Sequence, residues 1–253
     1  MPFSYKNLLI ILSIFGALHA HDGPSANILK SNYEPADQCF QIIGKEAQET
    51  VGVKKLLPIL QAKPDFTTRI NALHKDCLAF TSPNKIVIPN PKLLNSLTYG
   101  MVRCILFHEA IHAKYEDPKK LFVYDKIAVP ATALMFSLIP LTVLKICRVR
   151  NKYSLASAIA SFLYLKNMAG KRLLKMKRQE IERRADTEGF QATKCESCVR
   201  ECALLTEAGE KFDATNAKQI KDMGYLDAHE VHTIAKNLKG QMCPVHIHLA
   251  TTK

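Results

Sequence analysis

The segment from Leu106 to His112 reads Leu-Phe-His-Glu-Ala-Ile-His, and it constrains this chain more than any other. On a helix, side chains four residues apart share one face, so the imidazoles of His108 and His112 can reach one metal ion. Glu109 projects beside them, where its carboxylate can take a proton from a water molecule on that ion. Two neutral imidazoles and a carboxylate suit zinc, and an open fourth coordination position is typical of a catalytic site. The alternative is a core helix whose two histidines have other partners.

The residues before this segment predict where its helix begins. Asn90 is a favourable N-cap and Pro91 a favourable first residue, so we expect a helix to begin there and to continue past His112. Apolar residues at near-helical spacing would bury one face of that helix. They are Leu94, Leu97, Met101, Ile105 and Ile111.

A suitable third ligand lies downstream, between Gln179 and Asp186. This stretch has helical character and contains the pattern Glu-x-x-Ala-Asp, which begins at Glu182. A carboxylate oxygen from Glu182 would complete a set of three protein ligands and leave the fourth position to water.

Together the two motifs resemble a known family. The chain is similar to the HtpX-like proteases and the CAAX prenyl endopeptidases, which are HExxH zinc metallopeptidases of the gluzincin type. These enzymes join HExxH on one helix to a Glu on a later helix, often with hydrophobic segments between them. The resemblance extends from about Lys85 to Phe190, and Asp117 sits where relatives often have an acidic residue. The matching residues are His108, Glu109, His112, Glu182, Ala185 and Asp186.

The resemblance implies zinc-assisted hydrolysis of peptide bonds, with one catalytic Zn²⁺ on His108, His112 and Glu182. The ion would lower the pKa of its bound water and polarise the scissile carbonyl. Glu109 would take the proton of that water and pass it to the leaving amine. Asp186 is expected to hydrogen-bond within the site, for example to a ligand histidine. The alternatives for this Asp are a helix-capping role or a salt bridge with one of the arginines that precede it, Arg183 and Arg184.

The reaction also needs a donor for the oxyanion. Many relatives place a His shortly before a Pro near the C-terminus, with an Arg beyond. The comparable stretch here begins at Cys243 and offers His246 and His248 as donors, but no Arg follows. His229 and His232 are further candidates, and each of these histidines could instead be a surface or structural residue.

The first twenty residues predict a secretory signal peptide. Lys6 supplies a positive charge, Leu8 to Phe15 an apolar core, and Gly16 to Ala20 a small-residue end with cleavage after Ala20. An uncleaved anchor is the competing interpretation. We therefore expect an exported protein, periplasmic or membrane-associated, with its catalytic domain outside the cytosol.

A hydrophobic hairpin is predicted over residues 127–165, between the two halves of the metal site. Ile127 to Leu144 holds eighteen residues without a charge, and Tyr153 to Leu165 forms a second, shorter apolar stretch. Two membrane crossings would return both half-sites to one side; the alternative is a buried or membrane-dipping helical hairpin. Most of the net charge of +12 lies between Lys145 and Arg184, which favours anionic headgroups as its partners over nucleic acid.

The remaining pattern predicts a mainly α fold with a small β-sheet (α+β), organised as a zincin-like core with the hairpin inserted. Pro35 to Lys63 suggests two helices, the second containing Leu56 to Leu60. Cys77 to Ala79 and Lys85 to Ile88 suggest short strands. The segment from Lys85 to Pro89 is our candidate for an edge that binds substrate as an added strand, or else an ordinary edge strand. The expected divisions are residues 1–20, 21–126, 127–165 and 166–253.

The chain has eight cysteines, and behind an export signal an even number favours disulfides. Cys243 would pair with one of three cysteines near the start of the C-terminal part, namely Cys195, Cys198 and Cys202. Cys39 would pair with Cys77, while Cys104 and Cys147 are expected to be free thiols. The alternative is a second, structural zinc site, because Cys-x-x-Cys is a common half of one.

Two classes of function follow. The first is a zinc endopeptidase acting on exported or membrane-associated proteins, in a role such as envelope quality control, with peptide substrates and the membrane as partners. The second is a non-catalytic envelope scaffold stabilised by disulfides or zinc. Retention of Glu109 favours the enzyme, because a scaffold has no use for a base, whereas the missing C-terminal Arg favours the scaffold.

Overall fold

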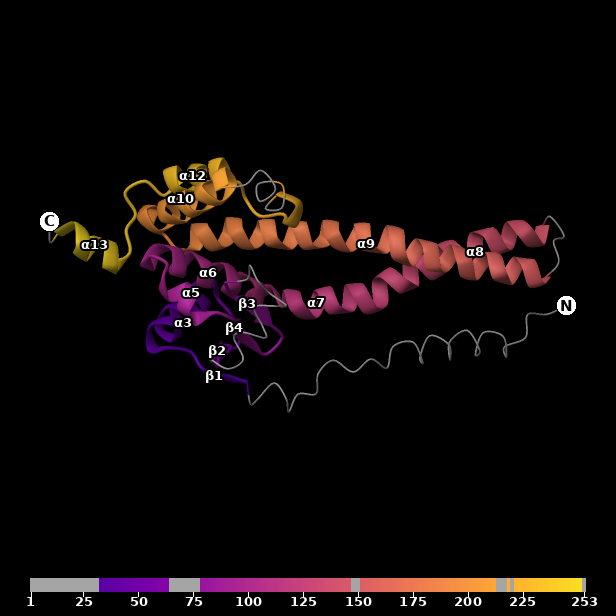
Figure 1. Ribbon diagram of the computed structural model, residues 1–253, viewed down its shortest axis with the longest axis horizontal. Coiled ribbons are helices and arrows are strands. Elements are labelled where there is room, and N and C mark those ends of the chain that lie inside the picture. Colours follow the sequence, from indigo (N-terminus) through magenta and orange to yellow (C-terminus); the bar gives the residue numbers. More distant parts are fainter. Residues whose placement is uncertain (1–31, 64–77, 147–150, 213–217, 219–220, 252–253) are drawn as a thin grey trace.

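The computed structural model describes residues 32–63, 78–146, 151–212, 218 and 221–251 (Figure 1). The expected signal peptide at 1–20 lies outside these residues. Within the described part the fold is mainly helical with one small sheet, which confirms the α+β class. The sheet and the shorter helices gather at one end, while two long helices extend away from them.

The sheet has four strands in the order β1-β2-β4-β3. They are β1 (Tyr33–Pro35), β2 (Ile59–Ala62), β3 (Phe80–Ser82) and β4 (Lys85–Ile88). β4 runs parallel to β2 and antiparallel to β3. The helix expected to contain Leu56 to Leu60 is wrong, because this apolar run is too short for a helix and its last two residues belong to β2, which pairs on both sides.

β4 is an interior strand, so the prediction of a peptide-binding edge at Lys85 to Pro89 is also wrong. Both of its edges carry ladder hydrogen bonds, and Ile86, Val87 and Ile88 are fully buried. The sequence pattern could not decide this, since a continuous apolar run suits a buried strand as well as an edge strand. The two end strands of the sheet are β1 and β3, and β3 lies against the helix that carries HExxH.

That helix is α6 (Tyr99–Tyr115), and it has its own N-cap at Thr98. Asn90 does cap a helix, α5 (Pro91–Asn95), but this one ends after five residues. The single helix expected from Pro91 past His112 is therefore two helices. α6 is the centre of the fold and packs against α3 (Gln38–Val51) and two later helices. Its buried face includes Leu106, Phe107 and Ile111.

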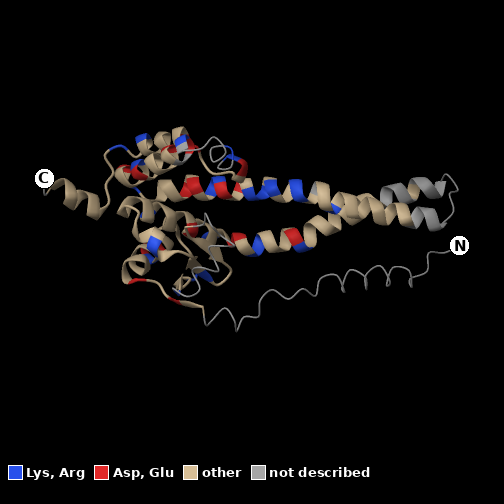
Figure 2. Cartoon of the chain, in the orientation of Figure 1, with Lys and Arg blue, Asp and Glu red and all other residues tan. Residues whose placement is uncertain are grey.

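After α6 the chain forms α7 (Asp117–Val123), a π-helical turn η1 (Tyr124–Ala128), α8 (Val129–Ile146) and α9 (Asn151–Ala192). α8 packs along the first part of α9, and the pair extends away from the sheet (Figure 1). α9 runs without a break through residue 165, so one helix carries both the second apolar stretch and Glu182. Figure 2 shows Lys and Arg gathered on its middle part. Within the described ranges, no helix is both long enough and apolar enough to cross a membrane.

The C-terminal part consists of α10 (Glu196–Phe212), α12 (Ala228–Asn237) and α13 (Pro244–Thr251). α10 packs against both α6 and α12. α9 approaches α6 closely at Gly189, where an added Cβ would stand 3.0 Å from the backbone nitrogen of His108. This absence of a side chain lets the helix that carries Glu182 pass directly beside HExxH.

Candidate metal centre

His108, His112 and Glu182 converge on one point between α6 and α9. The Nε2 atoms of the two histidines are 2.9 Å apart, and Glu182 Oε2 lies 3.3 Å from Nε2 of His108 and 3.4 Å from Nε2 of His112. Tetrahedral zinc with ligands at about 2.0–2.1 Å separates its ligand atoms by about 3.3 Å. The three donor atoms therefore fit around one such ion, and the predicted ligands are the ones that the fold brings together.

The site is largely enclosed but opens on one side. The two histidines are buried, whereas the Glu182 side chain is 22% exposed. The i, i+4 spacing on α6 aligns the imidazoles, and the crossing of α9 at Gly189 supplies the third donor. Two elements far apart in sequence thus build the group.

Asp186 lies where the sequence suggested, beside a histidine of the metal group. Its Oδ1 accepts a hydrogen bond from Nδ1 of His108 at 2.7 Å, and its Oδ2 accepts one from the backbone nitrogen of Leu226 at 2.9 Å. The alternative partners are engaged elsewhere, since Arg183 pairs with Glu230 and Arg184 with Asp117.

Asp117 contacts Nδ1 of His112 in the same way that Asp186 contacts Nδ1 of His108. Its Oδ2 lies 3.0 Å from Nδ1 of His112, and its two oxygens accept hydrogen bonds from Nη2 of Arg184 at 2.5 and 2.7 Å. A carboxylate on each Nδ1 fixes the tautomer that presents Nε2 as a metal ligand. The role of Arg184 could not be read from the sequence, because the contact joins residues 67 positions apart.

Negative charge surrounds the two imidazoles and shifts their protonation. Burial acts to lower the pKa of His108, but hydrogen bonds with Asp186 and Glu182 outweigh it and raise that pKa well above its usual value. The pKa of His112 is raised in the same way, by Asp117 and Glu182 against burial. Burial would raise the pKa of Glu182, yet its hydrogen bonds with both histidines hold it far below the usual range. The group is thus an electrostatic environment that favours a cation.

Glu109, the expected base, is buried beside the metal group and has a partner that the sequence did not reveal. The hydroxyl of Thr81, on β3, lies 2.8 Å from Glu109 Oε2 and 2.9 Å from the backbone carbonyl of the same residue. No role for Thr81 was expected from the sequence. Its position on β3 ties this end strand of the sheet to the carboxylate.

The two C-terminal histidines do not join this group. Both ring nitrogens of His246 are engaged, Nδ1 with three cysteine sulfurs and Nε2 with Glu201. The ring of His246 contacts Tyr99 at the first residue of α6, and His108 lies nine residues further, about 13 Å along the helix. His248 is exposed on α13. The assignment of His246 as an oxyanion donor is therefore wrong, and His248 has no support from its position.

A tyrosine lies nearer to the metal group. The ring centroid of Tyr225 is 5.9 Å from that of His108, and the next residue, Leu226, donates its backbone N–H to Asp186. Tyr225 follows Gly224, whose backbone is in the left-handed region at φ +95° and packs against Gln179. Sequence reasoning missed Tyr225, because no local pattern connects it to HExxH.

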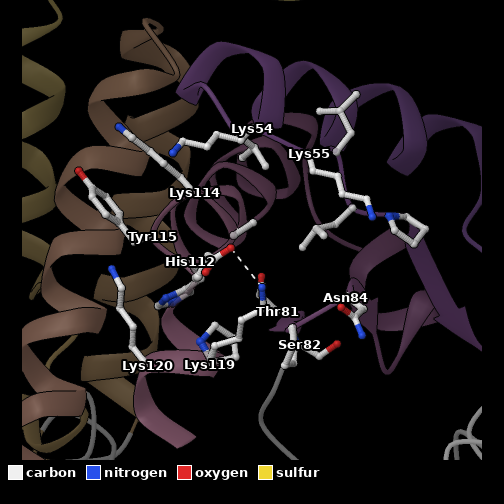
Figure 3. Close-up of a pocket in the computed structure, with 18 residues that line it drawn as sticks. Lys54, Lys55, Thr81, Ser82, Asn84, His112, Lys114, Tyr115, Lys119 and Lys120 are labelled. Atoms are coloured by element: carbon white, nitrogen blue, oxygen red, sulfur yellow. Dashed lines mark hydrogen bonds and ion pairs between the residues drawn. The ribbon is translucent and has the colours of Figure 1, made fainter. Parts of the chain in front are cut away.

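A cleft of about 580 Å³ opens beside His112 (Figure 3). Its wall includes Thr81 and five lysines, which Figure 3 shows around the opening. They are Lys54, Lys55, Lys114, Lys119 and Lys120. Lys114 pairs with Glu188 and Lys119 with Glu116, whereas no ion pair among the described residues includes the other three lysines. The cleft is therefore strongly basic.

The cysteines of the described residues are all thiols, so the expected disulfide to Cys243 is wrong. Cys198 Sγ and Cys243 Sγ lie 3.8 Å apart, far beyond the bond length of about 2 Å. A hydrogen bond from Cys198 is the main cause that lowers the pKa of Cys195 to about 4. Cys39 is free and exposed while Cys77 and Cys147 lie outside the described residues, and Cys104 is the buried thiol that was predicted.

Comparisons of the chain with protein-family models, with curated proteins and with solved structures found no match. The likeness to the HtpX-like and CAAX prenyl endopeptidases therefore stays a prediction from the motifs.

Proposed function

We propose that the protein is a zinc-dependent endopeptidase. The observation that carries the proposal is the convergence of His108, His112 and Glu182 with a carboxylate, Glu109, that is close to them but is not one of the three donors. A purely structural metal site needs four ligands and no base. Three donors plus a buried carboxylate are the parts of a hydrolytic site.

Zinc bound by these residues would lower the pKa of a water molecule and polarise the scissile carbonyl. Glu109 is placed to act as the base that would accept the proton of the attacking water and pass it to the leaving amine. Thr81 holds the Glu109 carboxylate in one orientation through its hydrogen bond. Asp186 and Asp117 orient the two imidazoles, so the ligand atoms need little rearrangement on binding the ion.

Tyr225 takes the role that the sequence had assigned to His246 or His248. Its ring centroid lies 5.9 Å from that of His108, and we propose that its phenol donates a hydrogen bond to the oxygen of a carbonyl bound at the metal group. A donor at that point would stabilise the oxyanion of the tetrahedral intermediate.

The zincin-like core that we propose consists of α6, α9 and the sheet. Because β3 is an end strand and its Thr81 contacts the base, we propose that an extended substrate segment lies along β3 rather than along β4. The lysines of the adjoining cleft favour a substrate with acidic side chains on the part that enters it.

We also propose that the protein associates with membranes or with unfolded exported proteins, because α8 and the first part of α9 present an apolar surface. α8 and α9 expose large apolar side chains along their packed length, an arrangement that attracts other apolar surfaces. They are Leu134, Met135, Phe136, Ile159, Leu163, Tyr164 and Met168.

The scaffold alternative is favoured by one observation. His246, the expected oxyanion donor, is used in a cysteine cluster instead, so the C-terminal part has a structural rather than a catalytic arrangement. If Tyr225 does not replace it, the protein would bind zinc without turnover.

The test compares zinc content and casein cleavage for the parent protein, Glu109→Gln, Glu182→Gln and Glu180→Gln. Glu180 lies on the same helix as Glu182 but is exposed and pairs with Lys177, so it is the matched control. We expect cleavage by the parent and the control only. Glu109→Gln should keep its zinc, and Glu182→Gln should lose the catalytic ion. Zinc in the parent without cleavage of casein or of an acidic peptide would support the scaffold.

A further inference from the structure

A second group of metal-binding side chains lies at the opposite end of α6 from His112. Its residues form two short motifs, Cys195-x-x-Cys198 and Cys243-x-x-His246, on different helices. Cys195 and Cys198 flank the start of α10, and Cys243 and His246 flank the start of α13. We propose that these four residues hold a structural zinc ion that fastens α13 to α10.

The distances among the four side chains match a tetrahedral site. Zinc with sulfur at about 2.3 Å and nitrogen at about 2.0 Å separates two sulfurs by about 3.8 Å, and sulfur from nitrogen by about 3.6 Å. Cys198 Sγ and Cys243 Sγ are 3.8 Å apart. Nδ1 of His246 lies 3.4, 3.5 and 3.2 Å from the sulfurs of Cys195, Cys198 and Cys243.

The three cysteines of the group are enclosed by protein, and the His246 side chain is 12% exposed. Cys195 and Cys198 are fully buried, and Cys243 is 4% exposed. Three thiols cannot all be paired in disulfides among themselves, so oxidation would leave one of them over. Four protein ligands without an open position are typical of structural zinc.

Glu201 connects this group to the metal helix. Its Oε1 lies 2.9 Å from Nε2 of His246, so the carboxylate fixes the tautomer that turns Nδ1 toward the sulfurs. Its Oε2 accepts hydrogen bonds from the hydroxyl of Thr98, the N-cap of α6, and from the backbone nitrogen of Gly100 at 3.0 Å. A Cβ at Gly100 would stand 2.4 Å from that oxygen, so only glycine admits the contact.

Glu201 is therefore a positioning residue for both sites. One carboxylate accepts from an orphan backbone N–H in the first turn of α6, that of Gly100, and orients His246 at the same time. Metal at the cysteine group would hold Glu201 in place and thereby fix the first turn of the helix that carries His108 and His112.

Cobalt(II) substitution tests the site without reference to activity. Sulfur-to-cobalt charge-transfer absorption arises only from thiolate ligands, so the group of His108, His112 and Glu182 cannot produce it. We expect the parent protein to bind two cobalt ions and to show this absorption. Cys198→Ser should bind one cobalt ion and lose most of the charge-transfer absorption. Cys39→Ser changes an exposed cysteine and is the matched control. It should retain both cobalt ions and the absorption. A parent without the band, or equal bands in the two variants, overturns the proposal.

A second measurement avoids any dependence on variant folding. A mercurial reagent added to the zinc-loaded parent should release one zinc per chain by occupying the thiols, and should leave the second zinc on the group of His108, His112 and Glu182. Loss of the cysteine-bound zinc should speed amide hydrogen exchange at residues 100–103, in the first turn of α6. Unchanged exchange there would show that Glu201 does not transmit the effect of the metal.

Glu201 itself is tested by cobalt affinity. Replacing the hydrogen-bond partner of a ligand histidine typically weakens metal binding by about 10- to 100-fold, and we expect that loss for Glu201→Ala. Glu201→Gln keeps an acceptor oxygen for Nε2 but loses the charge, so its affinity should fall between those of the parent and of Glu201→Ala. Equal affinity in Glu201→Ala and the parent would remove Glu201 from the site.

Discussion

The hydroxyl of Thr81 lies 2.8 Å from the carboxylate of Glu109, so an end strand of the sheet holds the carboxylate beside the metal group. We expect Thr81→Val to lower kcat of peptide hydrolysis by about tenfold or more, since a hydrogen bond to a charged group contributes about 1.5–3 kcal/mol. Thr81→Ser keeps the hydroxyl and should retain most of the rate. Steady-state kinetics, with zinc content measured in parallel, separates a loss of the Thr81 hydrogen bond from a loss of metal. Equal rates for the Val and Ser variants would contradict the role.

The contact between Asp186 and His108 predicts an effect on metal affinity. Asp186→Asn should weaken zinc binding at the α6–α9 group by about 10- to 100-fold, because the amide no longer holds the Nδ1 proton as a carboxylate does. Asp222, an exposed residue paired with Lys175, offers the control substitution Asp222→Asn. Competitive zinc titration with a chelating dye measures the zinc affinity of both variants. An affinity loss shared by the two variants would point to a general effect of charge.

The metal group could be predicted from sequence only where its geometry is local. The i, i+4 spacing of His108 and His112 and the Glu-x-x-Ala-Asp pattern each lie within one helix, so the helical repeat alone orients them. That α9 crosses α6 at this point, with Gly189 against His108, depends on tertiary packing and has no local signature.

The errors have physical causes of the same kind. His246 stands three residues after Cys243, the same spacing as in Cys195-x-x-Cys198, and this repeat was a signal for the second group. The expected export signal drew the interpretation toward disulfides instead. The run from Leu56 to Leu60 was assigned to a helix because four apolar residues fit either structure, and only pairing with β4 decides between them.

The shifted pKa values predict how zinc stabilisation depends on pH. The raised pKa of His108 stabilises the metal-free fold below the unfolded value of about 6.5, and this contribution is lost as pH rises through the folded value. The lowered pKa of Glu182 stabilises it above about pH 4, and that contribution is lost in stronger acid. Zinc needs neutral imidazoles and replaces the lost protons. The Tm difference between zinc-loaded and chelated protein should therefore grow as pH rises above the unfolded histidine value of about 6.5.

Thermal unfolding of the parent and of Glu182→Gln checks this. The variant lacks one ligand of the α6–α9 group but keeps the cysteines, so its Tm difference should be smaller and should rise less with pH. If the Tm difference of the parent stays constant or falls as pH rises, the protons do not belong to the metal-site histidines.

Tyr225 predicts a loss in kcat without a loss of zinc. Tyr225→Phe removes the phenolic donor while keeping the ring against His108, and loss of an oxyanion donor costs about 10²–10³ in kcat. His248→Ala, on the exposed side of α13, is the comparison and should hydrolyse peptides at nearly the parent rate. Full activity in Tyr225→Phe, or a comparable loss in His248→Ala, would return the donor role to the C-terminal segment.

The basic cleft predicts a preference for acidic substrates. Lys54 and Lys55 line it beside His112 and enter no ion pair within the described ranges, so their charge is available to a bound peptide. We test a peptide with acidic residues on one side of the scissile bond. The double variant Lys54→Glu with Lys55→Glu should raise KM for this peptide by about tenfold or more. It should also abolish the dependence of that KM on salt concentration. Lys92→Glu with Lys171→Glu changes two exposed lysines outside the cleft, on α5 and α9, and is the matched control for net charge. Because electrostatic attraction acts on binding, kcat should change little. A neutral peptide that suffers the same rise in KM would show that the lysines shape the cleft rather than select charge.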